Sequence, residues 1–185
     1  AAGADRSGRV QVRSQRSARR GLGEKSAAEV GVAGVSGHSV GEITAAALAG
    51  IFDAETAIKF VQCRADAMAT AAAAESTSMA AILGGEQSTV EAKLAELGLE
   101  PANYNGGGQI VAAGSAAAIA ELQSTGIEGS RIIPLQVAGA FHTRYMASAV
   151  GVLGDYAEGI TVNDPKTKIW TNAGGRNVET GSEFK

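Results

Sequence analysis

The stretch Gly37–Glu42, with the sequence Gly-His-Ser-Val-Gly-Glu, constrains the fold of this chain more than any other. The residues before it, 29–36, are mostly apolar and favour a β-strand, and those after it, 43–50, are rich in helix formers. A G-x-S-x-G turn between a strand and a helix is the layout of a nucleophile elbow, with serine at the apex. The pattern predicts Ser39 as a nucleophile, with an ordinary strand-to-helix turn as the alternative.

The backbone of this turn also predicts a catalytic feature. Gly37 and Gly41 supply backbone without side chains where strand and helix nearly touch. The N–H of Val40, at the start of the predicted helix, is expected to point to where an oxyanion would develop. Val40 N–H is therefore the predicted oxyanion donor.

Composition excludes several classes of protein. The 185 residues suffice for one domain, or one domain with a small insert, and 45% hydrophobic residues are typical of a globular protein. Cys63 is the only cysteine, so an intramolecular disulfide and a Cys-based metal site are excluded, and we expect no metal. No apolar run approaches the roughly 18 residues of a membrane span. We therefore expect a cytoplasmic protein with no membrane partner.

The charge is distributed unevenly along the chain. Residues 1–25 carry seven basic and two acidic residues, and the remainder carries nine basic and seventeen acidic residues. An Arg- and Ser-rich segment is compatible with nucleic-acid binding or with an organellar transit peptide. Because it has no interleaved aromatics and no hydrophobic period, we favour an unmatched basic leader over 1–28, disordered or non-native, and no nucleic-acid partner.

A serine hydroxyl is a weak nucleophile and needs a general base. His38 is a poor candidate because neighbouring side chains at a tight turn project apart, which leaves His142 as the predicted base. Asp155 and Asp164 both follow His142, whereas the α/β-hydrolase order places the acid before the histidine. We therefore expect a dyad with Ser39 in which a backbone carbonyl orients His142.

Arg64 is out of place on the helix predicted over 54–74. It falls on the apolar stripe of that helix, whose other members are Ala57, Phe60, Val61, Ala65 and Met68. A buried guanidinium needs an anion beside it, because desolvating the charge alone is costly. The anion is either a carboxylate or helix C-terminus elsewhere in the protein, or a substrate carboxylate held by two hydrogen bonds.

The middle of the chain predicts a second structural unit. The expected elements have the order β-α-β-β-α-β over 78–138, which is that of a ferredoxin-like split βαβ unit: strands 79–83, 100–105, 109–113 and 131–137, and helices 88–97 and 116–122. Further along we expect a helix over 144–153, a strand over 168–171 and a turn over 172–175. The last residues, 181–185, are expected to add no element.

Four segments, in this order, resemble malonyl-CoA:acyl carrier protein transacylases, in the style of the actinobacterial enzymes of fatty acid and polyketide synthesis. They are Gly37–Glu42, Arg64–Met68, Pro101–Asn105 with Gln109–Gly114, and Val137–Thr143. The resemblance runs from about Val30 to Gly181. It implies an α/β fold, with an α/β-hydrolase-like large subdomain over 29–76 and 142–185 and an inserted ferredoxin-like (βαββαβ) small subdomain over 77–141.

The resemblance also implies roles for individual residues. Ser39 would take a malonyl group from coenzyme A as an acyl-enzyme, and His142 would act as general base and later activate the phosphopantetheine thiol of acyl carrier protein. Arg64 would pair with the malonyl carboxylate. Beyond the coenzyme A thioester, which is the substrate, no cofactor is implied. Further substrate-binding residues would be Asn103, Asn105, Gln109, Met68 and Phe141, with Arg131 and Arg144 contacting the carrier protein.

The sequence departs from the family pattern at both ends. The family begins with a strand and a Gly-Gln-Gly-x-Gln loop that supplies the second oxyanion donor, and it continues well beyond Lys185, including the strand whose carbonyl orients the histidine. Neither part is found here, so the chain resembles a piece truncated at both ends. Because loss of one oxyanion donor alone lowers the rate by about 10²–10³, we expect poor activity.

Two other functions stay open at this point. A serine hydrolase or thioesterase on a similar core would transfer the acyl group to water and would not need Arg64. A non-catalytic module that docks the acidic carrier protein would not need Ser39.

Overall fold

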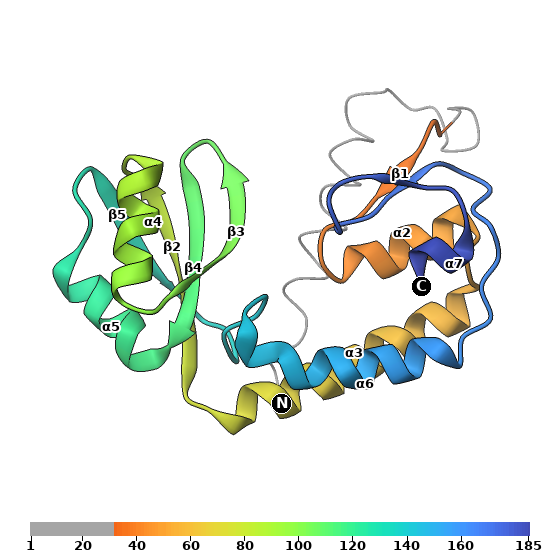
Figure 1. Cartoon of the computed structure of the whole chain (residues 1–185), viewed down its shortest axis with the longest axis horizontal. Helices are drawn as coiled ribbons and strands as arrows, with labels where there is room; N and C mark the ends of the chain where they lie inside the picture. Colours follow the sequence, from red (N-terminus) through yellow and green to blue (C-terminus); the bar gives the residue numbers. More distant parts are fainter. Residues whose placement is uncertain (1–31) are drawn as a thin grey trace. The chain divides into compact units, whose positions relative to one another are not determined.

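The computed structural model describes residues 32–185, drawn in colour in Figure 1. The basic leader predicted over 1–28 lies outside the described residues. The chain divides into two compact units, one ending at Cys63 and resuming over Gly154–Lys185, the other Arg64–Leu153. We call them the elbow unit and the sheet unit. Residues 64–76 and 142–153 therefore group with the expected small subdomain.

The sheet unit contains a four-stranded antiparallel sheet with the strand order β3-β4-β2-β5. This arrangement and the β-α-β-β-α-β chain order confirm the ferredoxin-like prediction. The elements are β2 (Thr77–Gly84), α4 (Gln87–Glu96), β3 (Glu100–Gly106), β4 (Gln109–Ser115), α5 (Ala116–Thr125) and β5 (Ser130–Leu135).

The central strands of this sheet are buried on both faces. Ala80 and Ile82 of β2 pack with Leu94 of α4 and Leu122 of α5, so both helices cover one face (Figure 1). Met79 points to the opposite face, as alternation along a strand requires, and belongs to a separate cluster.

The elbow unit contains a small sheet with the order β1-β6-β7. Its elements are β1 (Val35–Ser36), α2 (Gly41–Ala49), β6 (Ile169–Trp170), β7 (Asn177–Val178) and α7 (Gly181–Phe184). β1 is parallel to β6, and β6 is antiparallel to β7. Ile43, Ile51 and Ile169 lie in the core of this unit. Among the described residues, the strand expected over 29–36 is limited to β1.

The expectation that residues 181–185 add no element is wrong, because they contain α7. Thr180 caps this helix by accepting a hydrogen bond from Glu183 N–H at 3.1 Å. The sequence Thr-Gly-Ser-Glu at 180–183 is the local signature of a capping box, which predicts a helix start at this point. Phe184 then packs edge-on against Phe52, with ring centroids 6.3 Å apart.

Two long helices each contribute residues to both units. α3 (Ala54–Ala74) has the predicted bounds, and Asp53 caps it by accepting a hydrogen bond from Thr56 N–H at 2.8 Å. α6 (Ala147–Glu158) follows a 3₁₀ turn, η1 (Arg144–Met146), and extends beyond the predicted end at 153. Within residues 32–185, no helix is both long enough and apolar enough to cross a membrane.

The difference in burial between two isoleucines predicts that the same substitution, Ile→Ala, lowers the free energy of unfolding by different amounts. Ile82 is 0% exposed and Ile58 is 70% exposed. Ile82→Ala should lower the free energy of unfolding by about 2–5 kcal/mol, because it leaves a cavity in a packed core. Ile58→Ala should change it by no more than about 0.5 kcal/mol. Urea unfolding followed by circular dichroism measures both, and equal losses would contradict the assigned core.

Candidate active site

Ser39 stands at the apex of the turn between β1 and α2, as the strand–turn–helix pattern predicts. Its φ is +55°, in the left-handed region that residues with a side chain rarely occupy. Directly after it, Gly41 N–H donates to His38 C=O and Glu42 N–H donates to Ser39 C=O, both at 3.0 Å, which starts α2. A strained non-glycine residue at the head of a helix points to a functional position.

Gly37 is required by the close approach of strand and helix. A Cβ built on Gly37 would lie 1.9 Å from the carbonyl oxygen of Gly41 and 2.5 Å from the backbone nitrogen of Glu42. These are backbone atoms, which cannot turn aside as a flexible side chain can. The elbow therefore excludes every residue except glycine at position 37.

Asn172, for which the sequence predicts only a turn, is bonded to the elbow through its side chain. Its Oδ1 accepts a hydrogen bond from Ser39 N–H at 3.0 Å, and its Nδ2 donates to Gly37 C=O at 2.5 Å. The Glu42 carboxylate accepts hydrogen bonds from Thr171 Oγ1 at 2.6 Å and from Asn172 N–H at 2.8 Å. Because these partners are more than 120 residues apart, no local sequence signal indicates the contacts.

The N–H of Val40 differs from those of its neighbours in the elbow in having no acceptor among the described residues. Ser39, Gly41, Glu42 and Ile43 all donate their N–H groups to acceptors within the elbow unit. Over residues 32–185, the structure assigns no acceptor to the N–H of Val40. This is the group that the sequence predicts as an oxyanion donor.

Arg64 lies on α3 at the start of the sheet unit and is half-buried. Burial lowers the pKa of its guanidinium from the ordinary value for arginine, because desolvation disfavours the charged form. Ala67 and Ala71, at three and seven residues further along, form the buried face here. Ala65, predicted on the apolar stripe, is exposed instead, because the packed face follows the 64-67-71 spacing.

His142 precedes η1 and also has a left-handed backbone, with φ +62°. The next residue, Thr143, is buried, and its hydroxyl donates to Ala140 C=O at 2.6 Å. Arg144 forms an ion pair with Glu100, and its guanidinium lies 4.8 Å from the ring centroid of Tyr145. The Thr143 contact closes the His142 turn, and the ion pair of Arg144 joins it to the start of β3 at Glu100.

The remaining predicted site residues all lie in the sheet unit. Asn103 and Asn105 are on β3 and Gln109 begins the adjacent strand β4, so the three share one hairpin. Met68 and Phe141 pack against one cluster that contains Ala67, Ala71, Met146 and Ala149. Arg131 is exposed on β5.

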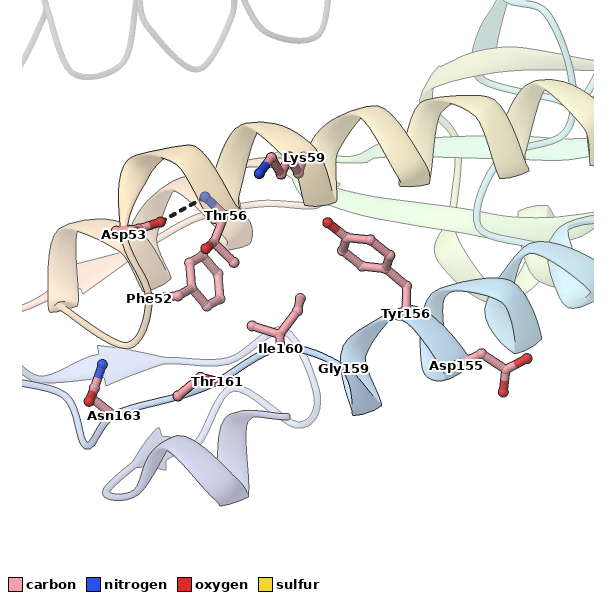
Figure 2. Close-up of a pocket in the computed structure, with 10 residues that line it drawn as sticks. All are labelled: Phe52, Asp53, Thr56, Lys59, Asp155, Tyr156, Gly159, Ile160, Thr161 and Asn163. Carbon is pink, nitrogen blue, oxygen red and sulfur yellow. Dashed lines mark hydrogen bonds between the residues drawn. The ribbon is translucent and has the colours of Figure 1, made fainter.

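A hollow of about 670 Å³ lies in the elbow unit (Figure 2). Phe52, Tyr156 and Ile160 are the large apolar side chains of its lining, together with polar groups such as Thr56 and Asn163. None of the predicted site residues lines it. Within the described part of the chain, no cluster of three His, Cys, Asp or Glu side chains suits a metal ion.

The sequence matches the acyl transferase domain family over residues 24–183. The chain belongs to this family. It is 46% identical over 149 residues to the malonyl CoA-acyl carrier protein transacylase of Mycolicibacterium smegmatis, a match that covers 80% of this chain and 51% of that protein. The chain thus spans about half the length of the curated relatives it matches.

Solved structures of related enzymes share the fold of this acyl transferase chain. The crystal structure of the Mycobacterium tuberculosis enzyme aligns with a TM-score of 0.80 at 40% identity, over 92% of this chain and 55% of that one. A malonyl-transacylase solved in complex with its type II PKS acyl-carrier protein aligns with a TM-score of 0.75 at 25% identity, over 93% and 56% of the two chains. These likenesses confirm the predicted two-subdomain α/β fold.

The elbow geometry predicts opposite effects for alanine at two glycines. Gly37→Ala should lower the free energy of unfolding by about 3 kcal/mol or more, because its Cβ meets backbone atoms. Gly151→Ala is the matched control on α6, where a Cβ meets nothing within 4 Å. It should raise stability by about 0.4–1 kcal/mol. Thermal denaturation distinguishes the two, and a Gly37→Ala protein as stable as the wild type would contradict the elbow.

Proposed function

We propose that this chain carries out malonyl transfer from coenzyme A to the phosphopantetheine thiol of an acyl carrier protein. The observation that carries the proposal is Ser39, held with a left-handed backbone at the head of α2 inside a G-x-S-x-G turn. Family membership and the names of the related enzymes support the choice of donor and acceptor.

In the first half of the reaction, Ser39 Oγ attacks the thioester carbonyl carbon of malonyl-CoA, and His142 takes the hydroxyl proton. The new C–O bond replaces the C–S bond, and coenzyme A leaves as a thiol after receiving that proton. Val40 N–H stabilises the oxyanion that develops on the carbonyl oxygen. In the second half, His142 deprotonates the carrier thiol, whose sulfur attacks the acyl carbonyl; the C–O bond to Ser39 breaks, and His142 returns the proton to Ser39 Oγ.

Arg64 selects the acyl group in this proposal. A half-desolvated guanidinium favours an anion, and the free malonyl carboxylate supplies one. Met68 and Phe141 limit the volume beside the carboxylate, which disfavours branched acyl groups by about 1–3 kcal/mol per methyl. Asn103, Asn105 and Gln109 are the proposed polar contacts to the substrate.

The carrier protein is the proposed macromolecular partner, and Arg131 and Arg144 are the proposed contacts to its acidic surface. Arg144 is also paired with Glu100, so it would recruit the carrier while holding the His142 turn. Thiol-to-thiol acyl transfer involves no change in oxidation state, so we propose that no cofactor is needed. The proposed location is the cytoplasm.

Intact-mass spectrometry after mixing with malonyl-CoA tests the acyl-enzyme. We expect a malonyl adduct on the wild-type chain and none on Ser39→Ala. Arg64→Ala should slow malonyl loading by roughly 10- to 100-fold, because a charge-assisted contact is lost, and should leave loading from acetyl-CoA unchanged. Arg176→Ala, which removes an exposed arginine paired with Glu183, is the matched control and should load normally.

Three outcomes would contradict the proposal. If Arg64→Ala slows malonyl and acetyl loading equally, Arg64 does not bind the malonyl carboxylate. An adduct that water discharges as fast as a pantetheine thiol would indicate a hydrolase. A folded chain that forms no adduct and binds the carrier protein equally well with Ser39→Ala would indicate a docking module.

A further inference from the structure

The side chain of Asn172 spans the turn that carries Ser39. Its two polar atoms bond to two peptide groups of the elbow, the C=O of Gly37 and the N–H of Ser39. A side-chain amide with one donor and one acceptor reproduces the pairing that a neighbouring β-strand would give. β1 ends at Ser36, so Asn172 continues the pairing of β1 and β6 past the point where the strands separate.

A second set of bonds holds Asn172 in place. The carboxylate of Glu42, in the first turn of α2, accepts the N–H of Asn172 and the hydroxyl of Thr171. The segment after β6 is therefore fixed on both sides of Ser39, through Gly37 before it and Glu42 after it. Of the four hydrogen bonds between this segment and the elbow, three are made by side chains of the segment and one by its backbone.

These contacts stabilise the left-handed backbone of Ser39, which the local sequence of the elbow does not favour by itself. A serine disfavours the left-handed backbone, so something outside the turn has to stabilise it. The peptide plane that contains the N–H of Val40 follows Ser39, so its direction depends on the backbone angles of Ser39. Any change in the Ser39 backbone would therefore move both its hydroxyl and the Val40 N–H.

We propose that Asn172 is a positioning residue, held by Glu42 and Thr171, that keeps Ser39 in its reactive backbone conformation. The inference rests on the proposed role of Ser39 as the nucleophile. Asn172 does not touch the acyl group in this account and acts only through the serine.

The test measures the reactivity of Ser39 without malonyl-CoA, using phenylmethanesulfonyl fluoride as the probe. The serine oxygen bonds to sulfur, fluoride leaves, and the hydroxyl proton passes to a base. Asn172→Ala should lower the maximal labelling rate by about 10- to 100-fold, as expected for a misplaced reacting group. The probe concentration at half-maximal rate should stay unchanged, because Asn172 does not bind the probe.

Two controls separate positioning from loss of stability. Asn163→Ala removes another side-chain amide of the elbow unit, which donates to Ile51 C=O at 3.4 Å. The probe should label Ser39 in Asn163→Ala at the wild-type rate. This should hold even if Asn163→Ala and Asn172→Ala lower the melting temperature by the same amount. Glu42→Gln keeps an acceptor for Thr171 and Asn172 and should label within about 3-fold of wild type, because a neutral hydrogen bond is only modestly weaker than a charged one. Glu42→Ala should label as slowly as Asn172→Ala.

Wild-type labelling rates in Asn172→Ala and Glu42→Ala would overturn the inference, as would an equal slowing in Asn163→Ala. A wild-type Ser39 that the probe does not modify would overturn both the inference and the proposed nucleophile. Labelling that slows as expected, in a chain that forms no malonyl adduct, would support the positioning role and overturn only the malonyl transfer.

Discussion

The left-handed backbone of Ser39 is the constraint on which the elbow unit depends. It needs glycine at position 37, because a side chain there would collide with the backbone of Gly41 and Glu42. It also needs the segment after β6, which bonds to the turn through Asn172 and to the first turn of α2 through Glu42. The small sheet β1-β6-β7 therefore serves to bring that segment beside the serine.

The predicted base stands on the same kind of backbone in the sheet unit. His142, like Ser39, is one of only two non-glycine residues with positive φ among residues 32–185. Its turn is fastened by the buried hydroxyl of Thr143 and by the ion pair of Arg144 with Glu100. Strained backbone persists only where surrounding contacts over-determine it, and such residues gather at functional sites. Ser39 and His142, which the sequence predicts as nucleophile and base on chemical grounds, are thus also the two described non-glycine residues with positive φ.

The sequence predicted the parts of the fold that depend on local patterns. The βαββαβ order followed from alternating and helical periodicities, and the bounds of α3 followed from its cap at Asp53. The contacts of Asn172 were missed because Ser39 and Asn172 are 133 residues apart and asparagine in a turn needs no such explanation. The small helix α7 was missed for a different reason, since its capping box at Thr180 is a local signal that was not recognised.

Hydrogen exchange at the Ser39 amide, followed by NMR, tests the central claim that a long-range contact holds the nucleophile. The account predicts a protected Ser39 amide in the wild-type chain and loss of that protection in Asn172→Ala, with core amides such as that of Ile82 unaffected. A Ser39 amide that exchanges at the rate of an unstructured peptide in the wild-type chain would contradict it, because the elbow would then not be held as described.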